Sequence, residues 1–396
     1  MKNSRPVNVR RPEVMGWVQT EVERYQSPLV DEIRRSGGVL EREGLCVRLA
    51  SAFGFCDGVR RAIEIAYATC RMFPERRIWL IGEIIHNPEV NARLDALGLR
   101  HLPWSGESEE YGKLTPEDVV IIPAFGVPVH LRRLLEEKGV ALVDSTCGNV
   151  MKVWQRVRNY AGRGITSIIH GKVRHEESMA TASQSRGEDG KGRFLVIFSE
   201  EEARMVADYI EGKGERSAFL KHFAHCCSEG FDPDEHLKEI GMANQTTMLK
   251  SETTRIQNLL REAVVHRDGH DARFHVFDTI CGATQDRQNA LFELLQHPLD
   301  MMFIIGGYNS SNTTHLAQIA ESRVPTFFVE SAECLESRES VRCYVPALKQ
   351  VVSRPLPDFP EPVWRVGITA GASCPANIIE QVIRRLAELR AASISH

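Results

Sequence analysis

The chain has 396 residues, of which 42% are hydrophobic and 26% charged, and its formal net charge is −4. This length exceeds one ordinary hydrophobic core and predicts two or three domains. The charge excludes a strongly basic nucleic-acid-binding protein, and no apolar run reaches the roughly 20 residues of a transmembrane helix.

The N-terminal region and the cysteines indicate a reducing compartment. The first residues lack the apolar core of a signal peptide, and the early acids Glu13, Glu21 and Glu23 argue against a transit peptide. We therefore expect a cytoplasmic protein whose ten cysteines are mostly thiols. No CxxC pair occurs, which excludes zinc ribbons and thioredoxin-type motifs.

In chain order, residues 1–45 are predicted to be a helical extension rich in Arg and Glu. The first α/β unit, 46–147, has three apolar strands that each end in a polar loop before a helix. These loops carry Cys56, His86 and Phe125–Gly126.

The second unit, 148–280, follows Cys147 and repeats the pattern with loops at His175 and Thr246. It contains a predicted surface insertion near 184–240, which is charged and glycine-rich in part. The third unit, 281–372, starts at Cys281. A proline-rich linker at 355–362 precedes its last strand, and a C-terminal helix is predicted over 373–396.

The spacing of the loops supports a threefold repeat. His86, His175 and Asn309 follow their respective cysteines by 30, 28 and 28 residues, and such a distance is typical of a βαβ crossover. Alternating strands and helices predict small parallel sheets. Since ligands bind at the carboxyl ends of such strands, we expect all these loops to converge on one site between the units.

Three cysteines in equivalent loops predict an iron–sulfur cluster. Thiolates are the usual ligands of cluster irons, and a cubane held by Cys56, Cys147 and Cys281 would keep one iron open as a Lewis acid. A single cysteine is more often a small buried hydrophobe, but placement in a repeat favours ligation. The other seven are interpreted as non-ligands, although His222, His225, Cys226 and Cys227 leave a zinc site as an alternative.

The remaining loops are rich in donors that suit a phosphate group, especially at helix N-termini. These residues are His86, Asn87, His175, Thr246, Ser310, Ser311, Asn312 and Ser373. Ordinary helix capping is the alternative for the serines and asparagines. Glu177 is a candidate proton donor, and its alternative is a first-turn glutamate favoured by the helix dipole.

These motifs resemble those of the 4-hydroxy-3-methylbut-2-enyl diphosphate reductase (LytB-type) family, in the same order. The resemblance covers about residues 40–385 and is closer to the plant and cyanobacterial branch. It rests on Gly54–Cys56, Ile85–Pro88, Asp144–Cys147, His175–Glu177, Gln245–Thr247, Asn309–Asn312 and Thr369–Ser373.

The resemblance implies an iron–sulfur oxidoreductase in which three α/β domains form a pseudo-threefold trefoil around a central [4Fe–4S] cluster. It implies reductive dehydroxylation of an allylic diphosphate to isopentenyl and dimethylallyl diphosphate, the last step of the non-mevalonate pathway. Glu177 would donate or relay protons, with Thr246 holding the hydroxyl and His175 beside them. The diphosphate would lie against His86, His175, Ser310, Ser311, Asn312 and Ser373.

The chain departs from the family pattern at a few positions. Phe125 replaces the histidine of the common bacterial form, as in the plant-like branch. Asp57–Gly58 and Gly148–Asn149 follow their cysteines in place of tryptophan-containing versions, and such changes are able to alter the cluster's potential.

Electrons are expected from a partner such as ferredoxin or flavodoxin, and the enzyme is expected to be a monomer or homodimer. Two alternatives stay open: a hydro-lyase, which would need no reductant, and a cluster-based sensor, which would not need Glu177.

Overall fold

The structure is a computed structural model that describes residues 6–42, 44–357 and 363–394, so part of the predicted linker at 355–362 lies outside the described residues. The described residues form two compact units. The first comprises 6–7, 75–82 and 100–281, and the second comprises 8–74, 83–99 and 282–394. No helix among them combines the length and the apolar character needed to cross a membrane.

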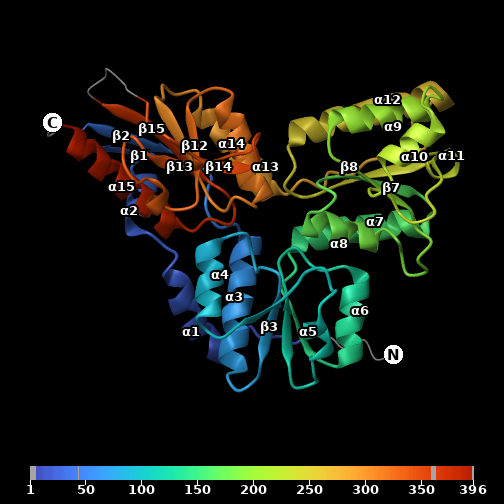
Figure 1. Cartoon of the computed structure of the whole chain (residues 1–396), viewed down its shortest axis with the longest axis horizontal. Coiled ribbons are helices and arrows are strands. Elements are labelled where there is room, and N and C mark those ends of the chain that lie inside the picture. The colour runs from blue at the N-terminus through green and yellow to red at the C-terminus, as the bar shows by residue number, and fades with distance from the viewer. Residues whose placement is uncertain (1–5, 43, 358–362, 395–396) are drawn as a thin grey trace. The chain divides into compact units, whose positions relative to one another are not determined.

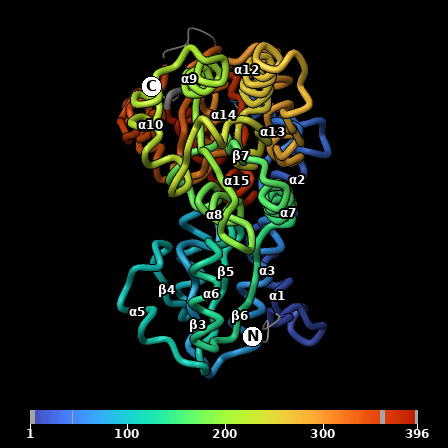
Figure 2. Tube along the Cα trace, turned by 90° about the vertical axis from the view of Figure 1, so that its right-hand side faces the viewer, coloured from blue at the N-terminus to red at the C-terminus, as the bar shows by residue number. Residues whose placement is uncertain are grey.

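The first unit contains two four-stranded sheets, and every strand pair in them is parallel. The first sheet has the order β4-β3-β5-β6, and Figure 2 labels all four strands. Its elements are β3 (Ile78–Ile81), β4 (Arg100–Leu102), α5 (Glu109–Gly112), β5 (Val119–Ile122), α6 (Val129–Lys138) and β6 (Ala141–Asp144). All four residues of β5 are buried, as expected for a strand covered on both faces.

The second sheet of this unit has the order β10-β9-β7-β8. Figure 1 shows α9 and α12 side by side on one of its faces and α7 and α8 on the other. The strands are β7 (Thr166–His170), β8 (Phe194–Ile197), β9 (Ile240–Asn244) and β10 (Phe274–His275). The helices are α7 (Gly148–Gly162), α8 (Glu176–Gln184), α9 (Glu200–Ile210), α10 (Arg216–His222), α11 (Pro233–His236) and α12 (Lys250–Asp268).

The second unit holds a five-stranded sheet of order β1-β2-β15-β11-β12, parallel except for the β1–β2 pair, and a separate β13–β14 hairpin. Its strands are β1 (Val39–Arg42), β2 (Leu45–Leu49), β11 (Met301–Ile305), β12 (Thr326–Val329), β13 (Val341–Val345), β14 (Gln350–Arg354) and β15 (Trp364–Ala370). Its helices are α1 (Pro12–Glu23), α2 (Pro28–Arg35), α3 (Asp57–Met72), α4 (Pro88–Asp95), α13 (Gly282–Leu294), α14 (Ser311–Glu321) and α15 (Ala376–Ile394), with a 3-10 turn at Ala332–Cys334.

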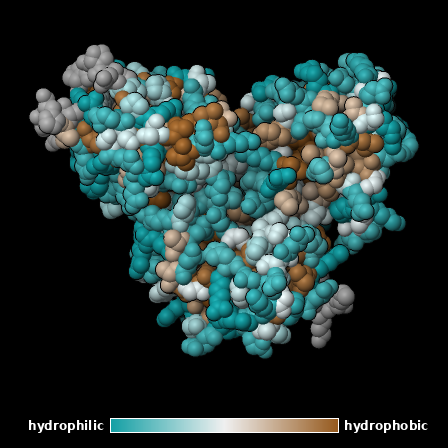
Figure 3. Space-filling view, in the orientation of Figure 1, coloured by the Kyte–Doolittle hydropathy of each residue, from teal (hydrophilic) through white to brown (hydrophobic). Residues whose placement is uncertain are grey.

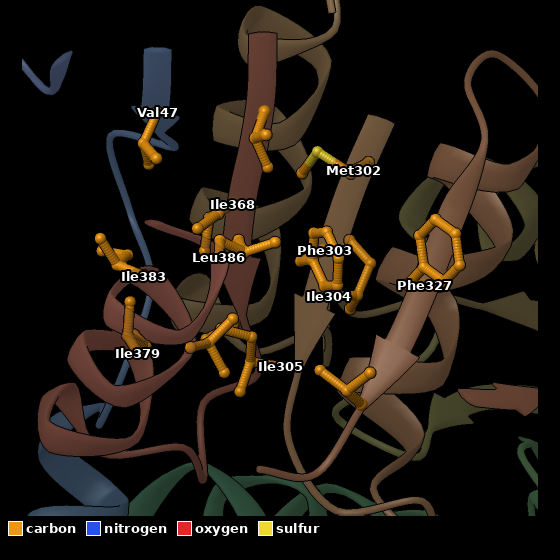
Figure 4. Packing of buried hydrophobic residues seen from close by; sticks show 14 of the residues in the cluster. Val47, Met302, Phe303, Ile304, Ile305, Phe327, Ile368, Ile379, Ile383 and Leu386 are labelled. Carbon is orange, nitrogen blue, oxygen red and sulfur yellow. The ribbon is translucent and has the colours of Figure 1, made fainter. Parts of the chain in front are cut away.

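The core of this unit forms where α15 covers the sheet. Figure 4 shows Ile379 and Ile383 of α15 beside Val47 and Ile368 of the strands, and all four belong to one buried cluster. The helical spacing of the isoleucines places them on one face, which is why an amphipathic helix is stable here.

The three sheets share one strand order, which confirms the predicted α/β architecture of three similar small sheets. Read from the same edge, the orders of the parallel strands are β4-β3-β5-β6, β8-β7-β9-β10 and β12-β11-β15-β2, and β1 extends the third sheet beyond β2 through an antiparallel pair. The last parallel strand of each sheet comes shortly before one of the three predicted ligands: Cys147 after β6, Cys281 after β10 and Cys56 after β2. The arrangement of the sheets as a trefoil around a cluster stays a prediction.

The sheets divide the chain differently from the units 46–147, 148–280 and 281–372. Strand β2 pairs with β15, so the strand that opens the first predicted unit completes the third sheet. The extension 1–45 contains the strand β1 as well as two helices. The predicted insertion 184–240 contributes β8, whose pairing with β7 makes it part of the second sheet.

Candidate functional site

Each predicted cluster ligand stands at the start of a helix. Cys56 and Cys147 are the N-cap residues of α3 and α7, and α13 begins directly after Cys281. The positive end of a helix dipole favours a negatively charged group such as a thiolate. The residue type and the local setting of all three cysteines therefore fit an iron–sulfur ligand set.

The backbone around the three cysteines is equivalent as well. The amide of Cys147 donates to the carbonyl of Ala124 at 3.0 Å, that of Cys281 to Thr246 at 3.0 Å, and that of Cys56 to Ala372 at 3.3 Å. Each acceptor lies two residues after the end of the neighbouring strand, β5, β9 or β15. One structural device thus positions all three thiols.

All ten cysteines are free thiols, and burial distinguishes several of the others from the predicted ligands. Burial raises the pKa of Cys70 to about 12 and also raises the pKa of Cys374. A thiol that resists ionisation is a poor ligand, because the thiolate is the form that binds metal. Within the described chain, the side chains of the zinc alternative, His222 to Cys227, do not form a metal-binding group.

Glu177 and Thr246 form a buried pair in the first unit. The Thr246 amide donates to Glu177 Oε1 at 2.5 Å, and the Thr246 hydroxyl donates to Oε2 at 3.0 Å. Their exposed fractions are 3% and 6%. Because the carbonyl of Thr246 also accepts the bond from Cys281, the candidate proton donor is tied to the loop that positions a predicted ligand.

His175 caps α8 and orients the start of the helix that carries Glu177. Its Nδ1 accepts a hydrogen bond from the Glu177 amide at 3.2 Å. The ring of Phe125 meets the His175 ring edge-on, with the centroids 6.0 Å apart. Phe125 therefore contributes a contact that fixes the imidazole, in place of a polar donor.

Asn149 reaches a predicted ligand from the first turn of α7. Its Nδ2 donates to Cys281 Sγ at 3.1 Å. Since Asn149 lies two residues after Cys147, this bond shows that the structure brings Cys147 and Cys281 to the same region of the first unit. Hydrogen bonds to ligand sulfurs are one of the means by which proteins tune cluster potentials.

In the second unit, a carboxylate joins two of the predicted loops. Glu83 Oε2 lies 3.1 Å from His86 Nδ1 and accepts a bond from Asn309 Nδ2 at 3.0 Å. The Ser373 hydroxyl donates to the His86 carbonyl at 3.1 Å. A Cβ on Gly307 would lie 2.7 Å from the same carbonyl, so only glycine permits this approach.

The start of α14 presents buried polar atoms of the kind that bind a phosphate. Ser310 caps the helix and accepts a bond from the Thr313 amide. Ser311 and Asn312 are 2% and 3% exposed, and the Ser311 hydroxyl and both side-chain atoms of Asn312 lack partners within the described chain. Buried polar groups are normally paired, so these atoms point to a polar ligand.

Each unit therefore gathers part of the predicted set. The first contains Cys147, Cys281, His175, Glu177 and Thr246, and the second contains Cys56, His86, Ser310, Ser311, Asn312 and Ser373. Sequence reasoning missed Glu83 as the residue that fixes His86, although it lies three residues before it in the same loop. Gln245 belongs to a motif on which the resemblance rests but was given no role, and its Oε1 accepts bonds from the Lys172 amide and the Ser178 hydroxyl.

Comparisons with known proteins identify the family of the chain. A family model described as LytB protein matches residues 47–387. A 4-hydroxy-3-methylbut-2-enyl diphosphate reductase of Synechococcus sp. (strain RCC307) is 47% identical over 384 residues, covering 96% of this chain and 92% of that protein. The same enzyme of Gloeobacter violaceus is 46% identical over 92% of this chain and 88% of its own length. These are cyanobacterial proteins, as the resemblance predicted.

Solved structures are similar as well. The structure of (E)-4-hydroxy-3-methyl-but-2-enyl diphosphate reductase, described as the terminal enzyme of the non-mevalonate pathway, aligns with a TM-score of 0.53 and 28% identity over 86% of this chain and 99% of the other. A reductase structure from Plasmodium falciparum aligns with a TM-score of 0.62 over 87% of this chain and 89% of the other. Its 20% identity supports the fold alone.

Proposed function

The chain belongs to the LytB protein family, and we propose that it is the oxidoreductase that removes the hydroxyl group of 4-hydroxy-3-methylbut-2-enyl diphosphate. Two electrons and two protons are consumed. The C–O bond breaks, the oxygen leaves as water, and protonation of the allylic carbon skeleton produces isopentenyl or dimethylallyl diphosphate. This reaction completes the non-mevalonate route to isoprenoid precursors.

The observation that carries the proposal is the equivalent setting of three cysteines in three similar sheets. Cys56, Cys147 and Cys281 each follow the last parallel strand of one of three equivalent sheets, precede a helix, and donate through their amide to an equivalent carbonyl. We propose that these thiolates hold a [4Fe–4S] cluster with one iron open to the substrate. When bound, such a cluster supplies electrons and a Lewis-acidic site for the substrate oxygen.

Glu177 and Thr246 are proposed to deliver a proton to the departing oxygen of the substrate. The Thr246 hydroxyl donates to Glu177 Oε2, so its lone pairs stay able to accept a bond from the substrate hydroxyl. When Glu177 is protonated, this bond can reverse, and Thr246 then passes a proton from Glu177 toward the departing oxygen. Burial of both groups keeps bulk water from competing for that proton.

The diphosphate is proposed to bind against His86, His175, Ser310, Ser311, Asn312 and Ser373. The amide groups at the N-terminus of α14 and its dipole attract an anion. The unpartnered side-chain atoms of Ser311 and Asn312 would gain hydrogen bonds from phosphate oxygens. Phe125 is an apolar contact for His175 and is not assigned a role in binding the diphosphate.

The electrons are proposed to come from ferredoxin or flavodoxin. The ten free cysteines support a reducing compartment such as the cytoplasm. Oxygen must be excluded in any assay, because a cluster with an open iron is prone to oxidation.

The test is an anaerobic assay of the purified protein with 4-hydroxy-3-methylbut-2-enyl diphosphate and reduced methyl viologen. We expect substrate-dependent bleaching of the dye, four irons per chain, and loss of both in Cys56→Ser. The Cys46→Ser variant is the matched control, because Cys46 is half-buried like the three predicted ligands but lies outside the repeat, and it should retain both.

A fully loaded protein that does not oxidise the dye with this substrate would refute the proposed reaction. Conversion of the substrate without any reductant would instead indicate a hydro-lyase. A loaded protein that binds no substrate would favour a sensor.

A further inference from the structure

We propose that the exposed face of α7, together with Val276 and Phe277, is the docking surface for an acidic iron–sulfur electron donor of the ferredoxin type. This surface, called here the α7 face, consists of Met151, Lys152, Arg156, Arg158, Val276 and Phe277. The inference rests on the proposed function, because it assigns the place where that reaction receives its electrons.

The charge of α7 is one-sided. The helix Gly148–Gly162 contains three cationic residues, Lys152, Arg156 and Arg158, and no acidic residue, and Arg163 follows at its C-cap. The structure pairs none of these four cations with a carboxylate within the residues it describes. By contrast, the nearby Lys250 is paired with Asp278. The α7 face thus presents uncompensated positive charge.

Apolar side chains lie among these cations. Met151, Val276 and Phe277 are 42%, 41% and 39% exposed, and the Arg156 guanidinium carbon lies 4.0 Å from the centroid of the Phe277 ring. This contact shows that the helix and the 276–277 segment form one surface. Brown apolar patches occur at several places in Figure 3, so the apolar residues alone would not select this face. On the α7 face they lie among cations that have no carboxylate partner in the described chain, and beside segments that carry two of the proposed ligands.

The α7 face borders two of the proposed cluster ligands. The Met151 amide donates to the Cys147 carbonyl at 3.0 Å, and Phe277 precedes Cys281 by four residues. Asn149, in the same first turn of α7, bonds to Cys281 Sγ. Electron transfer between proteins requires the donor to approach the acceptor closely, and a donor seated here would contact the two segments that carry these thiolates.

Charge complementarity identifies the chemistry of the partner. Oppositely charged surfaces accelerate association and make it sensitive to salt, while exposed aromatic and Met side chains are enriched at interface centres. An acidic donor with an apolar centre fits the α7 face, whereas a neutral or basic donor would leave its cations unpaired.

The test compares Lys152→Glu/Arg158→Glu with a matched control, Arg204→Glu/Lys221→Glu, which reverses two exposed cations elsewhere in the same unit. Each loaded protein is assayed with a reduced plant-type [2Fe–2S] ferredoxin and, separately, with reduced methyl viologen. We expect kcat/KM for ferredoxin to fall at least about tenfold in the α7 variant and to lose most of its salt dependence. Turnover with viologen and the thermal midpoint should remain near the wild-type values, and the control should behave as wild type.

Wild-type ferredoxin kinetics in the α7 variant would overturn the inference. If the wild-type protein is a dimer and the α7 variant is a monomer with unchanged ferredoxin kinetics, the inference is also overturned, because the face would then serve self-association. Failure of the wild-type protein to turn over with viologen would instead refute the proposed function, which keeps the two failures distinct.

Discussion

Replacing Glu177 by glutamine removes the proton that the carboxyl group can donate but keeps the size and hydrogen-bond geometry of the side chain. In the wild-type protein, Glu177 accepts one bond from the Thr246 amide and one from the Thr246 hydroxyl. In Glu177→Gln, the amide oxygen can accept from the Thr246 N–H, and the amide nitrogen can donate to the Thr246 hydroxyl, which is able to accept. The side-chain arrangement should therefore survive while the proton is lost.

The expected magnitudes differ between stability and catalysis. Each charge-assisted bond of about 1.5–3 kcal/mol becomes a neutral one of about 0.5–1.5 kcal/mol, so unfolding should become easier by about 1–3 kcal/mol. Loss of a general acid costs about 10²–10⁴ in rate, which corresponds to roughly 3–5 kcal/mol in the activation barrier. The rate should fall steeply while the thermal midpoint shifts by only a few degrees.

The assay is anaerobic viologen oxidation, with the rate divided by the iron content of the same sample. The exposed residue Glu201 provides the matched control, and Glu201→Gln should leave both the rate and the midpoint unchanged. A Glu177→Gln protein that keeps its cluster and works within about threefold of the wild-type rate would refute the proton relay.

Three further predictions follow from other contacts. Ser311→Ala should raise KM for the diphosphate substrate at least about tenfold. It should lower the free energy of unfolding by less than about 0.5 kcal/mol, because the buried Ser311 hydroxyl has no partner in the described chain. An unchanged KM would exclude Ser311 from the diphosphate site. Burial acts to raise the pKa of Asp118, but bonds from Thr115, Arg77 and Trp79 outweigh burial and hold the pKa below its usual value. Its stabilising effect is therefore present above the unfolded pKa of about 4 and is lost as pH falls through the lower folded pKa. Chemical unfolding should show that Asp118→Asn lowers the free energy of unfolding more at pH 7 than at pH 3. A difference between the two proteins that does not change with pH would contradict this. Asn149→Ala should make the cluster harder to reduce by on the order of tenfold, about 59 mV for one electron, since it removes the donor to Cys281 Sγ; a redox titration followed by electron paramagnetic resonance that finds the wild-type potential would rule this out.

Local pattern was sufficient to predict several features of this chain. The repeat of strand, cysteine and helix predicted Cys56, Cys147 and Cys281 as equivalent, and the hydrogen bonds of their amides follow one rule. The apolar strands expected before the loops at Phe125 and Asn309 were predicted to belong to parallel sheets, and the structure contains them as β5 and β11. These features depend on residues close together in the chain, so a sequence records them directly.

Long-range pairing was not predictable in the same way. Strand β2 lies next to β15, more than 300 residues away, and nothing in either strand names its partner, because backbone hydrogen bonds are the same for every residue type. Other contacts arise only where separate loops meet, namely those of Glu83, the Thr246–Glu177 pair and the Asn149–Cys281 bond. Thus the amino-acid order alone determined the repeat, the candidate ligands and the chemistry they permit. Only the tertiary structure decided which strand completes each sheet and which side chains touch, since those contacts depend on how distant segments fold together.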